Sequence, residues 1–434
     1  MKVSAETSQS ELLEKDRRFV WHPYTQMLSA PPPLPIVRGT GALLVDDQGN
    51  TYIDAVSSWW VNIHGHSHPY IAKKIAQQAT TLEHVIFAGF THPPAVALAE
   101  RLIDHLPDPL SKVFYSDNGS TAVEIAIKMA IQYYHNRDQP KKKLIALDQA
   151  FHGETFGAMS ASGDLSLNNA FKNQLFEVAR IPAPLKGKEA ESEKVLEQLL
   201  QEGDAYAFIF EPLIMGAGGM LMYEPAILDK LIRLCQKHGV LTIADEVMTG
   251  FGRTGQLFAI QHLATCPDLI CLAKGLTGGV LPLAVTCCTD KIYEAFLSED
   301  KGKTFFHGHS FTANPLGCAA ALASLDLLEG AECQENISRV VRRQRAFREK
   351  MEGHAAVKDI RQTGTILALE FNSPEKTSYF NQLRDQLYQF FLDRRILLRP
   401  LGNVIYFMPP YCISDKEMTE VYQAIEDALV HFNL

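Results

Sequence analysis

The sequence predicts an α/β fold: a large domain with a mostly parallel sheet, and a smaller α+β domain built from both chain ends. Between about residues 110 and 290, short apolar runs alternate with helical patterns. These runs show little period-two alternation, which is typical of strands buried on both faces of a sheet. Outside that region, short strand patterns occur near both termini. With 434 residues, 46% of them hydrophobic, the chain is long enough for two or three domains.

Strands and helices alternate through the large domain. Buried strands are expected at Lys112–Ser116, Leu144–Asp148, Ala205–Glu211, Val240–Glu246, Leu269–Ala273 and Pro282–Thr289. Helices are expected at Thr121–His135, Ala190–Gln201 and Pro225–His238. The first helix gathers apolar residues on one face, and Thr121 with Glu124 fits a capping box at its start.

The two chain ends have a different pattern. Short strands are expected near Ala42–Val45 and Thr51–Asp54, and again near Thr365–Phe371 and Val404–Met408, with helices between and after the last two. We expect residues 1–65 and 326–434 to form the small domain together. Residues 66–325 then form the large domain.

Composition restricts partners and location. The chain has 41 basic and 50 acidic residues, a net charge of −9, which argues against a general nucleic-acid binder. The polar segment Met1–Asp16 lacks the apolar core of a signal peptide, and the longest uncharged stretch, Gly275–Thr289, is too short to span a membrane. The eight cysteines form no Cys-x-x-Cys pair, which favours reduced thiols. We expect a cytoplasmic protein with neither nucleic-acid nor membrane partners.

Two charged residues follow neighbouring buried strands. Asp245 and Lys274 each lie at the carboxyl end of an expected strand, where ligands of parallel sheets bind. A charge there is costly unless it is paired or used. A lysine in a partly apolar pocket can lose its proton and act as a nucleophile, typically through a Schiff base. A structural ion pair explains these two residues equally well when they are considered alone.

Other strand exits carry small and polar residues. Ser116–Val123 leads from a strand into a helix, whose first turn offers N–H groups and hydroxyls that suit a phosphate. A plain N-cap explains that segment as well. In Phe151–Gly157, the Phe151 ring could stack on a planar group, while His152 alone is more often a structural residue. The loop Phe306–Pro315 indicates only that something approaches closely.

Two further motifs point to no site. Gly250, Gly252 and Gly255 match a dinucleotide-binding pattern, but they do not join a strand directly to a strong helix, so we interpret the match as chance. The alternating histidines of His64–His68 lack an acidic or cysteine partner at the usual spacing. A turn is therefore expected there, and no metal site is predicted.

In this order and spacing, the motifs resemble the class III, fold-type I aminotransferases, which use pyridoxal 5′-phosphate (PLP). Ala244–Gly255 followed by Ala273–Gly275 is highly specific, and the similarity spans nearly the whole chain. A closer resemblance is to those members that convert 8-amino-7-oxononanoate to 7,8-diaminononanoate in biotin synthesis, with S-adenosylmethionine as amino donor. That resemblance is carried by Trp21–Met27, Ser57–Trp60 with Ile63–Gly65, Arg399–Gly402 and Tyr406–Tyr411.

The resemblance implies a role for each candidate residue. Lys274 would hold the cofactor, and Asp245 would pair with its pyridine nitrogen. The full set of implied cofactor residues is Gly119, Ser120, Phe151, His152, Asp245, Lys274, Gly308, His309 and Ser310, of which Gly119 and Ser120 bind the phosphate and Phe151 stacks on the ring. Gly308, His309 and Ser310 would come from the partner subunit, which implies a homodimer with shared active sites. The implied residues for the small-molecule substrates are Tyr24, Trp59, Trp60, Arg253, Gly308, Arg399 and Tyr406, with Glu211 nearby and Arg399 gripping a carboxylate.

Some alternatives remain. Well-known members carry tyrosine where this chain has Phe151, and its hydroxyl helps to recognise S-adenosylmethionine. Relatives that use lysine as donor exist, so lysine is an alternative donor. His309 and Ser310 stand in place of the more familiar Pro-Thr. Another class III ω-aminotransferase would share Lys274 but not the tryptophan pair. A nicotinamide-dependent oxidoreductase and a non-catalytic binding module are the remaining alternatives.

Overall fold

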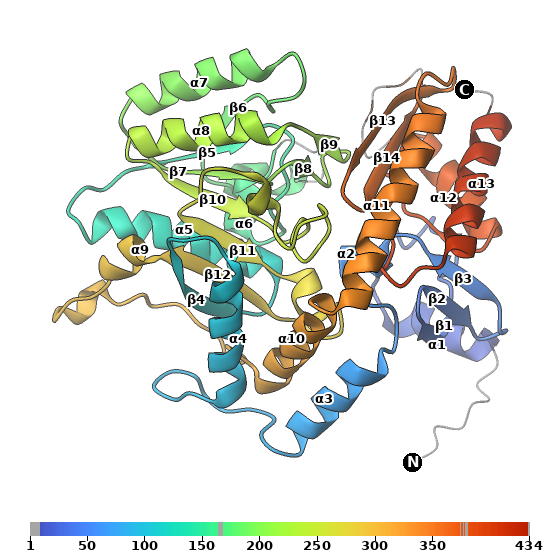
Figure 1. Ribbon diagram of the computed structural model, residues 1–434, viewed down its shortest axis with the longest axis horizontal. Coiled ribbons are helices and arrows are strands. Elements are labelled where there is room, and N and C mark those ends of the chain that lie inside the picture. Colours follow the sequence, from blue (N-terminus) through green and yellow to red (C-terminus); the bar gives the residue numbers. More distant parts are fainter. Residues whose placement is uncertain (1–8, 164–167, 374, 376, 378–380, 433–434) are drawn as a thin grey trace.

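The computed structural model describes residues 9–163, 168–373, 375, 377 and 381–432. The first half of the polar segment Met1–Asp16 therefore lies outside the described residues. Figure 1 shows the large sheet with its helices beside a smaller part, in which blue N-terminal strands lie next to orange and red C-terminal elements. No helix within the described residues combines the length and apolar character needed to cross a membrane.

Seven strands form the large sheet in the order β4-β12-β11-β10-β7-β5-β6. Their bounds are β4 Leu110–Ser116, β5 Lys143–Leu147, β6 Val178–Ile181, β7 Ala205–Phe210, β10 Leu241–Asp245, β11 Leu269–Leu272 and β12 Ala284–Thr289. Strand β12 runs antiparallel to β4 and β11, and the other neighbouring strands are parallel. The predicted α/β fold is confirmed. The edge strand β6 was not predicted, because Arg180 interrupts its short apolar run.

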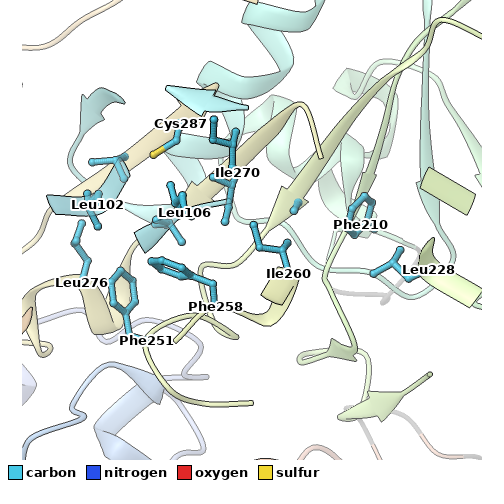
Figure 2. Close-up of a cluster of buried hydrophobic side chains, with 14 of the residues drawn as sticks. Leu102, Leu106, Phe210, Leu228, Phe251, Phe258, Ile260, Ile270, Leu276 and Cys287 are labelled. Carbon is cyan, nitrogen blue, oxygen red and sulfur yellow. The ribbon is translucent and has the colours of Figure 1, made fainter. Parts of the chain in front are cut away.

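Helices cover both faces of this sheet. One face carries α5 Gly119–His135, α6 Phe156–Ala161 and α9 Asp290–Glu294; the other carries α4 Pro93–His105, α7 Glu189–Gln201, α8 Pro225–Lys237 and α10 Pro315–Leu328. Figure 2 shows the core on the second face, where Leu102 of α4, Leu228 of α8 and Ile270 of β11 are buried. Burial on both faces explains the continuous apolar runs in the sequence.

The small domain joins the two chain ends. Its first sheet has the order β1 Ile36–Thr40, β2 Leu43–Asp46, β3 Thr51–Asp54 and β15 Ile396–Leu397, and its second contains β13 Val357–Thr363, β14 Ile366–Phe371 and β16 Val404–Phe407. Helices α11 Ala331–Met351, α12 Leu383–Asp393 and α13 Asp415–His431 pack beside them. Ile396 pairs with Ile53, so residues from both ends share one sheet. The domain boundaries after residues 65 and 325 stay a prediction, which this pairing supports.

Short elements complete the described chain. They are α1 Gln9–Phe19, α2 Ser57–Trp60, α3 Pro69–Ala79, the strands β8 Ile214–Met215 and β9 Leu221–Met222, and the 3-10 helices η1 Asn169–Gln174, η2 Ala259–His262, η3 Lys274–Thr277 and η4 Lys301–Lys303. Among these, α2 and η3 follow β3 and β11 closely and carry side chains of the candidate site.

The start of α5 differs from the prediction. Asn118 is the N-cap, and its side chain accepts a hydrogen bond from the backbone of Thr121 at 3.0 Å. The Thr121 hydroxyl completes the capping box by accepting from the Asn118 N–H. Glu124 is not part of this box. Its carboxylate instead accepts from Gly157 and Ala158, at 2.6 and 3.0 Å, in the first turn of α6.

Candidate active site

A cavity of about 640 Å³ lies between the large sheet and the small domain. Most of the predicted site residues line it: Tyr24, Trp59, Trp60, Gly119, Ser120, Phe151, His152, Asp245, Lys274, Arg399 and Tyr406. The polar residues at the strand ends and the aromatic residues of the chain ends therefore meet in one space.

Lys274 begins η3, close after β11. Its amine nitrogen Nζ lies 4.8 Å from the ring centroid of Trp60. Burial lowers the pKa of the amine to about 8, although electrostatic interaction with Asp245, and with Glu211 when that group is ionised, opposes the shift. The neutral amine is the form that acts as a nucleophile and a base. The site therefore makes this form accessible near neutral pH.

Asp245 ends β10 and is only 6% exposed. Its Oδ2 lies 2.7 Å from Nδ1 of the buried His152, and its Oδ1 accepts the N–H of Val247 at 3.1 Å. These hydrogen bonds compensate for burial of the carboxylate and fix its orientation. Nε2 of His152 is buried without a hydrogen-bond partner among the described residues. The side-chain contact of His152 is therefore the one that Nδ1 makes with Asp245, which orients the carboxylate.

Glu211 follows β7 and is a second buried carboxyl group in the cavity. One oxygen accepts the N–H of Phe151 at 2.8 Å, and the other accepts the N–H of Gly216 at 2.9 Å. Burial, and to a smaller extent the charge of Asp245, raise the pKa of Glu211 to about 8. Glu211 thus fixes the backbone of the ring-stacking residue Phe151.

The N-terminus of α5 forms a cradle for an anion. Here the Ser120 hydroxyl lies 2.8 Å from the Thr155 hydroxyl and accepts the Thr155 N–H at 2.9 Å. A Cβ on Gly119 would lie 2.5 Å from a methyl group of Val247, and one on Gly153 would collide with the Ser120 hydroxyl. Only glycine fits at these two positions. The cradle combines hydroxyls with the backbone N–H groups of a helix start, which suits a phosphate.

Aromatic side chains form the opposite wall. The Trp60 indole N–H donates to the Tyr406 hydroxyl at 2.9 Å. Tyr24 packs edge-on against Trp59, with ring centroids 5.4 Å apart, and the Arg399 guanidinium carbon lies 4.5 Å from the Trp59 ring centroid. Arg399 therefore adds a cationic fork to an otherwise apolar wall, as binding of a carboxylate requires.

Arg253 lies outside this lining. Its guanidinium donates to the carbonyls of Pro409 and Trp60, at 2.9 and 3.3 Å, and lies 5.2 Å from the Tyr411 ring centroid. The side chain is 1% exposed. Two of its N–H groups bind backbone carbonyls behind Trp60, and the predicted role of Arg253 in substrate binding stays a prediction. Arg253 connects the large domain to the small one.

Gly308, His309 and Ser310 also lie outside the lining. Gly308 and Ser310 are exposed, and the preceding segment is held on α5 by hydrogen bonds from Gln132 to the carbonyls of Lys303 and Thr304. The predicted contribution of these residues to the site of a partner subunit stays a prediction.

Glu154 lines the cavity but was not among the predicted site residues. Its carboxylate accepts a hydrogen bond from the Tyr24 hydroxyl. Its position in the sequence could have indicated this role, because Glu154 lies between the predicted site residues Phe151 and His152 and the start of α6.

The two remaining motifs have structural roles. Gly250, Gly252 and Gly255 lie in turns between β10 and η2, where no α-helix follows them. His64 lies 3.0 Å from the Ser324 hydroxyl, and His66 lies 2.8 Å from Asp54. In the described part of the chain, no group of three or more His, Cys, Asp or Glu side chains could hold a metal ion.

Comparisons with known proteins agree with this geometry. The model of the family "Aminotransferase class-III" matches residues 24–429. The adenosylmethionine-8-amino-7-oxononanoate aminotransferase of Synechococcus elongatus is 50% identical over 94% of this chain and 98% of its own length. A solved structure of the Methanocaldococcus jannaschii enzyme of that name has a TM-score of 0.90 at 38% identity, and covers 96% of this chain and 99% of its own. An ω-transaminase from Pseudomonas jessenii in complex with PMP has a TM-score of 0.91 at 29% identity, covering 97% of this chain and 98% of its own. The chain belongs to the class III aminotransferase family.

Proposed function

We propose that the chain transfers an amino group to 8-amino-7-oxononanoate, giving 7,8-diaminononanoate in biotin synthesis, with S-adenosylmethionine as donor. One observation carries the proposal: Lys274 and Asp245 share a cavity with an aromatic wall that ends at Arg399. Relatives named for this reaction, one of them 50% identical, support it.

The residues of the cavity fit the cofactor PLP, on which class III aminotransferases depend. Lys274 would bind it covalently, Asp245 would face its pyridine nitrogen, and the glycine-lined cradle at Ser120 would hold its phosphate. Phe151, fixed by Glu211, would stack on its ring. When bound, PLP supplies an electron sink for cleavage of a bond at the amino-bearing carbon.

The chain itself provides proton transfer and orientation. Burial lowers the pKa of the free Lys274 amine to about 8, so this amine can remove a proton from one carbon and deliver it to another. His152 orients the Asp245 carboxylate, which would face the pyridine nitrogen of the cofactor. The buried wall at Trp60 excludes water from this step.

The opposite wall recognises the keto acid. Arg399 would bind its terminal carboxylate, and the apolar faces of Trp59 and Tyr24 would contact its carbon chain. The Glu154 carboxylate, bonded to Tyr24, suits the ammonium group of the same substrate. The two ends of the substrate thus meet groups of opposite charge.

The homodimer and the cytoplasmic location belong to this proposal. Phe306 and Phe311 flank Gly308–Ser310 and are 76% and 63% exposed, which suits burial against a second copy. The free cysteines of the described chain suit a reducing compartment.

Lysine is the second candidate donor, and Phe151 is the observation that favours it. A phenylalanine offers no hydroxyl to S-adenosylmethionine at this position. Another class III ω-aminotransferase activity is the remaining alternative, since several similar structures are named ω-transaminases.

The donors can be separated in a half-reaction. The PLP-loaded protein is mixed with each donor alone, and loss of the cofactor absorbance is followed. We expect S-adenosylmethionine to bleach the band and lysine to leave it unchanged; the reverse would assign lysine as donor. Bleaching by neither, with bleaching by an ω-amino acid, would contradict the proposed reaction. Growth of a strain lacking the diamine-forming enzyme on biotin-free medium tests the whole reaction.

Phe151→Tyr gives a matched variant for this assay. Its added hydroxyl can make one more hydrogen bond, worth up to about tenfold in kcat/KM for S-adenosylmethionine. We expect kcat/KM for lysine as donor to stay unchanged. An equal gain for both donors would show that the hydroxyl does not act in donor recognition.

A further inference from the structure

The short element α2, Ser57–Trp60, is a turn with a strained backbone, and it carries Trp59 and Trp60. Ser57, Ser58 and Trp60 have φ values of 51°, 60° and 68°, in the left-handed region that favours glycine. None of the three is a glycine. Such a conformation persists only where surrounding contacts impose it. The contacts that impose it therefore determine where the two tryptophan rings lie.

A fully buried carboxylate supplies those contacts from outside the cavity. Asp54, at the end of β3, is 0% exposed. Its Oδ1 accepts the N–H groups of Ser58 at 2.8 Å and Val56 at 3.3 Å. Its Oδ2 accepts the Ser58 hydroxyl at 2.9 Å and lies 2.8 Å from Nε2 of His66. Both carboxylate oxygens are thus used to hold the turn.

The donor and acceptor roles in this network are fixed. The side-chain carbonyl of Asn62 accepts the N–H of Gly65 at 2.7 Å, which leaves its amide nitrogen to donate to Nδ1 of His66 at 3.1 Å. Nδ1 is then an acceptor, so Nε2 carries the proton that is donated to Asp54. His66 cannot change its tautomer without losing the bond to Asn62. Asp54 must therefore accept hydrogen bonds at both carboxylate oxygens, from the turn and from His66.

Among the described residues, Asp54 is the side chain that forms hydrogen bonds with Ser58. Elsewhere the turn is held by the Ser57 hydroxyl, which donates to the Met408 carbonyl at 2.9 Å, and by Arg253, which binds the Trp60 carbonyl. The rings that it carries face Arg399 and Lys274, at 4.5 and 4.8 Å. A shift at Ser58 would move both rings relative to these two groups.

We propose that the Asp54–His66 pair is a positioning device for substrate recognition, which holds the turn Ser57–Trp60 so that Trp59 and Trp60 form the substrate wall. The substrate side of this inference rests on the proposed function. Neither Asp54 nor His66 lines the cavity, so both act through the turn and not by touching substrate.

The test compares Asp54→Asn with Asp46→Asn. An asparagine amide must point an N–H at either Ser58 or His66, both of which are donors. Asp46 is a control of similar burial in the same sheet, 4% exposed, whose carboxylate binds Asn50 and does not reach the turn. We expect Asp54→Asn to raise KM for the keto acid about ten- to hundredfold, with kcat changed less than threefold. The control should change neither.

Tryptophan fluorescence gives a second readout that needs no activity. The chain has three tryptophans, and Trp21→Phe removes the 86% exposed one, leaving two on the turn. In that background we expect Asp54→Asn to shift emission to the red and to increase acrylamide quenching, while the PLP dissociation constant stays within twofold. Asp46→Asn should give the parent spectrum.

Two further variants keep the inference falsifiable. His66→Gln removes one partner of Asp54. It should shift KM and tryptophan emission in the same direction as Asp54→Asn, but by a smaller amount. It therefore replaces Asp54→Asn as the test if that variant does not fold. Ser58→Gly tolerates positive φ and should recover part of KM in the Asp54→Asn background. Unshifted emission in both Asp54→Asn and His66→Gln overturns the inference whatever the activity. If Asp54→Asn shifts the emission but the parent protein does not turn over the keto acid, the result would instead count against the proposed function.

Discussion

Opposing effects on one side chain, Lys274, determine the pH response of the site. Burial lowers the pKa of its amine to about 8, and the nearby carboxylates only partly oppose this. The amine is therefore protonated below that pH and neutral above it. We expect the rate at which cofactor-free protein captures PLP, followed by stopped-flow absorbance, to rise with pH and to level off above about pH 8. A flat profile between pH 6 and 9 would contradict this assignment.

Lys274→Ala tests the same side chain by removing its amine. It removes the only group that we assign to covalent attachment and proton transfer, so turnover should fall to background. PLP should still bind without a covalent bond, because Ser120 and the α5 N-terminus are unchanged. Near-normal turnover in a coupled assay would sink the mechanism.

Arg399→Lys tests carboxylate recognition. Lysine keeps the charge but loses the planar fork, and a hydrogen bond to a charged group is worth about 1.5–3 kcal/mol. We expect KM for the keto acid to rise about tenfold or more, with kcat nearly unchanged because the carboxylate is remote from the reacting carbon. Arg394→Lys, an exposed change five residues earlier, is the control. A kcat effect without a KM effect would argue against a carboxylate contact.

The sequence could predict some of these residues and not others. Asp245 and Lys274 each follow a buried strand, and parallel strands bring their ends together whatever the sequence between them. The aromatic wall came from resemblance alone. The contacts of Arg253 could not be predicted, because its partners, the carbonyls of Pro409 and Trp60, come from distant segments. No local pattern specifies such a contact.

Among the secondary-structure elements, α5 links stability to cofactor binding. Asn118 caps the helix whose first turn forms the phosphate cradle. Asn118→Ala should lower the free energy of unfolding by about 1 kcal/mol and also weaken PLP binding. Ser414→Ala removes the equivalent cap from α13, away from the cavity, and should cost similar stability without changing PLP affinity. Denaturant titration and PLP titration measure the two effects. Equal PLP affinity in both variants would show that the cap does not serve the cradle.

Elements with a strong local pattern were predictable, and those held by tertiary contacts were not. The strands of the large sheet are continuous apolar runs because helices cover both faces. The edge strand β6 contains Arg180, and pairing with β5 defines it. The positive φ values at Ser57 and Ser58 have no sequence signal, since Asp54 imposes the turn from another element.

Across the whole molecule, net charge and site charge differ. The chain carries −9 overall, yet the proposed ligands include a phosphate and a carboxylate. The α5 N-terminus, Lys274 and Arg399 supply a local positive field within the cavity. Overall charge therefore argues against a general nucleic-acid surface but says little about the small-molecule site.

The shared active site of the proposed dimer gives the last prediction. If Gly308–Ser310 serve the cavity of the partner subunit, each site combines Lys274 of one chain with Ser310 of the other. Lys274→Ala and Ser310→Asp should each be inactive, the second because a carboxylate would repel the cofactor phosphate. Ser310 is exposed in the single chain, so its replacement should not disturb folding.

Mixing these two variants separates the possibilities. Random exchange makes about half of the dimers mixed, and each mixed dimer regains one intact site, so about a quarter of the parental activity should return. A loop that served its own chain would leave every mixed site with one defect, and no activity would return. Sedimentation of the mixture must show dimers, because recovery in a monomeric sample would contradict the shared site.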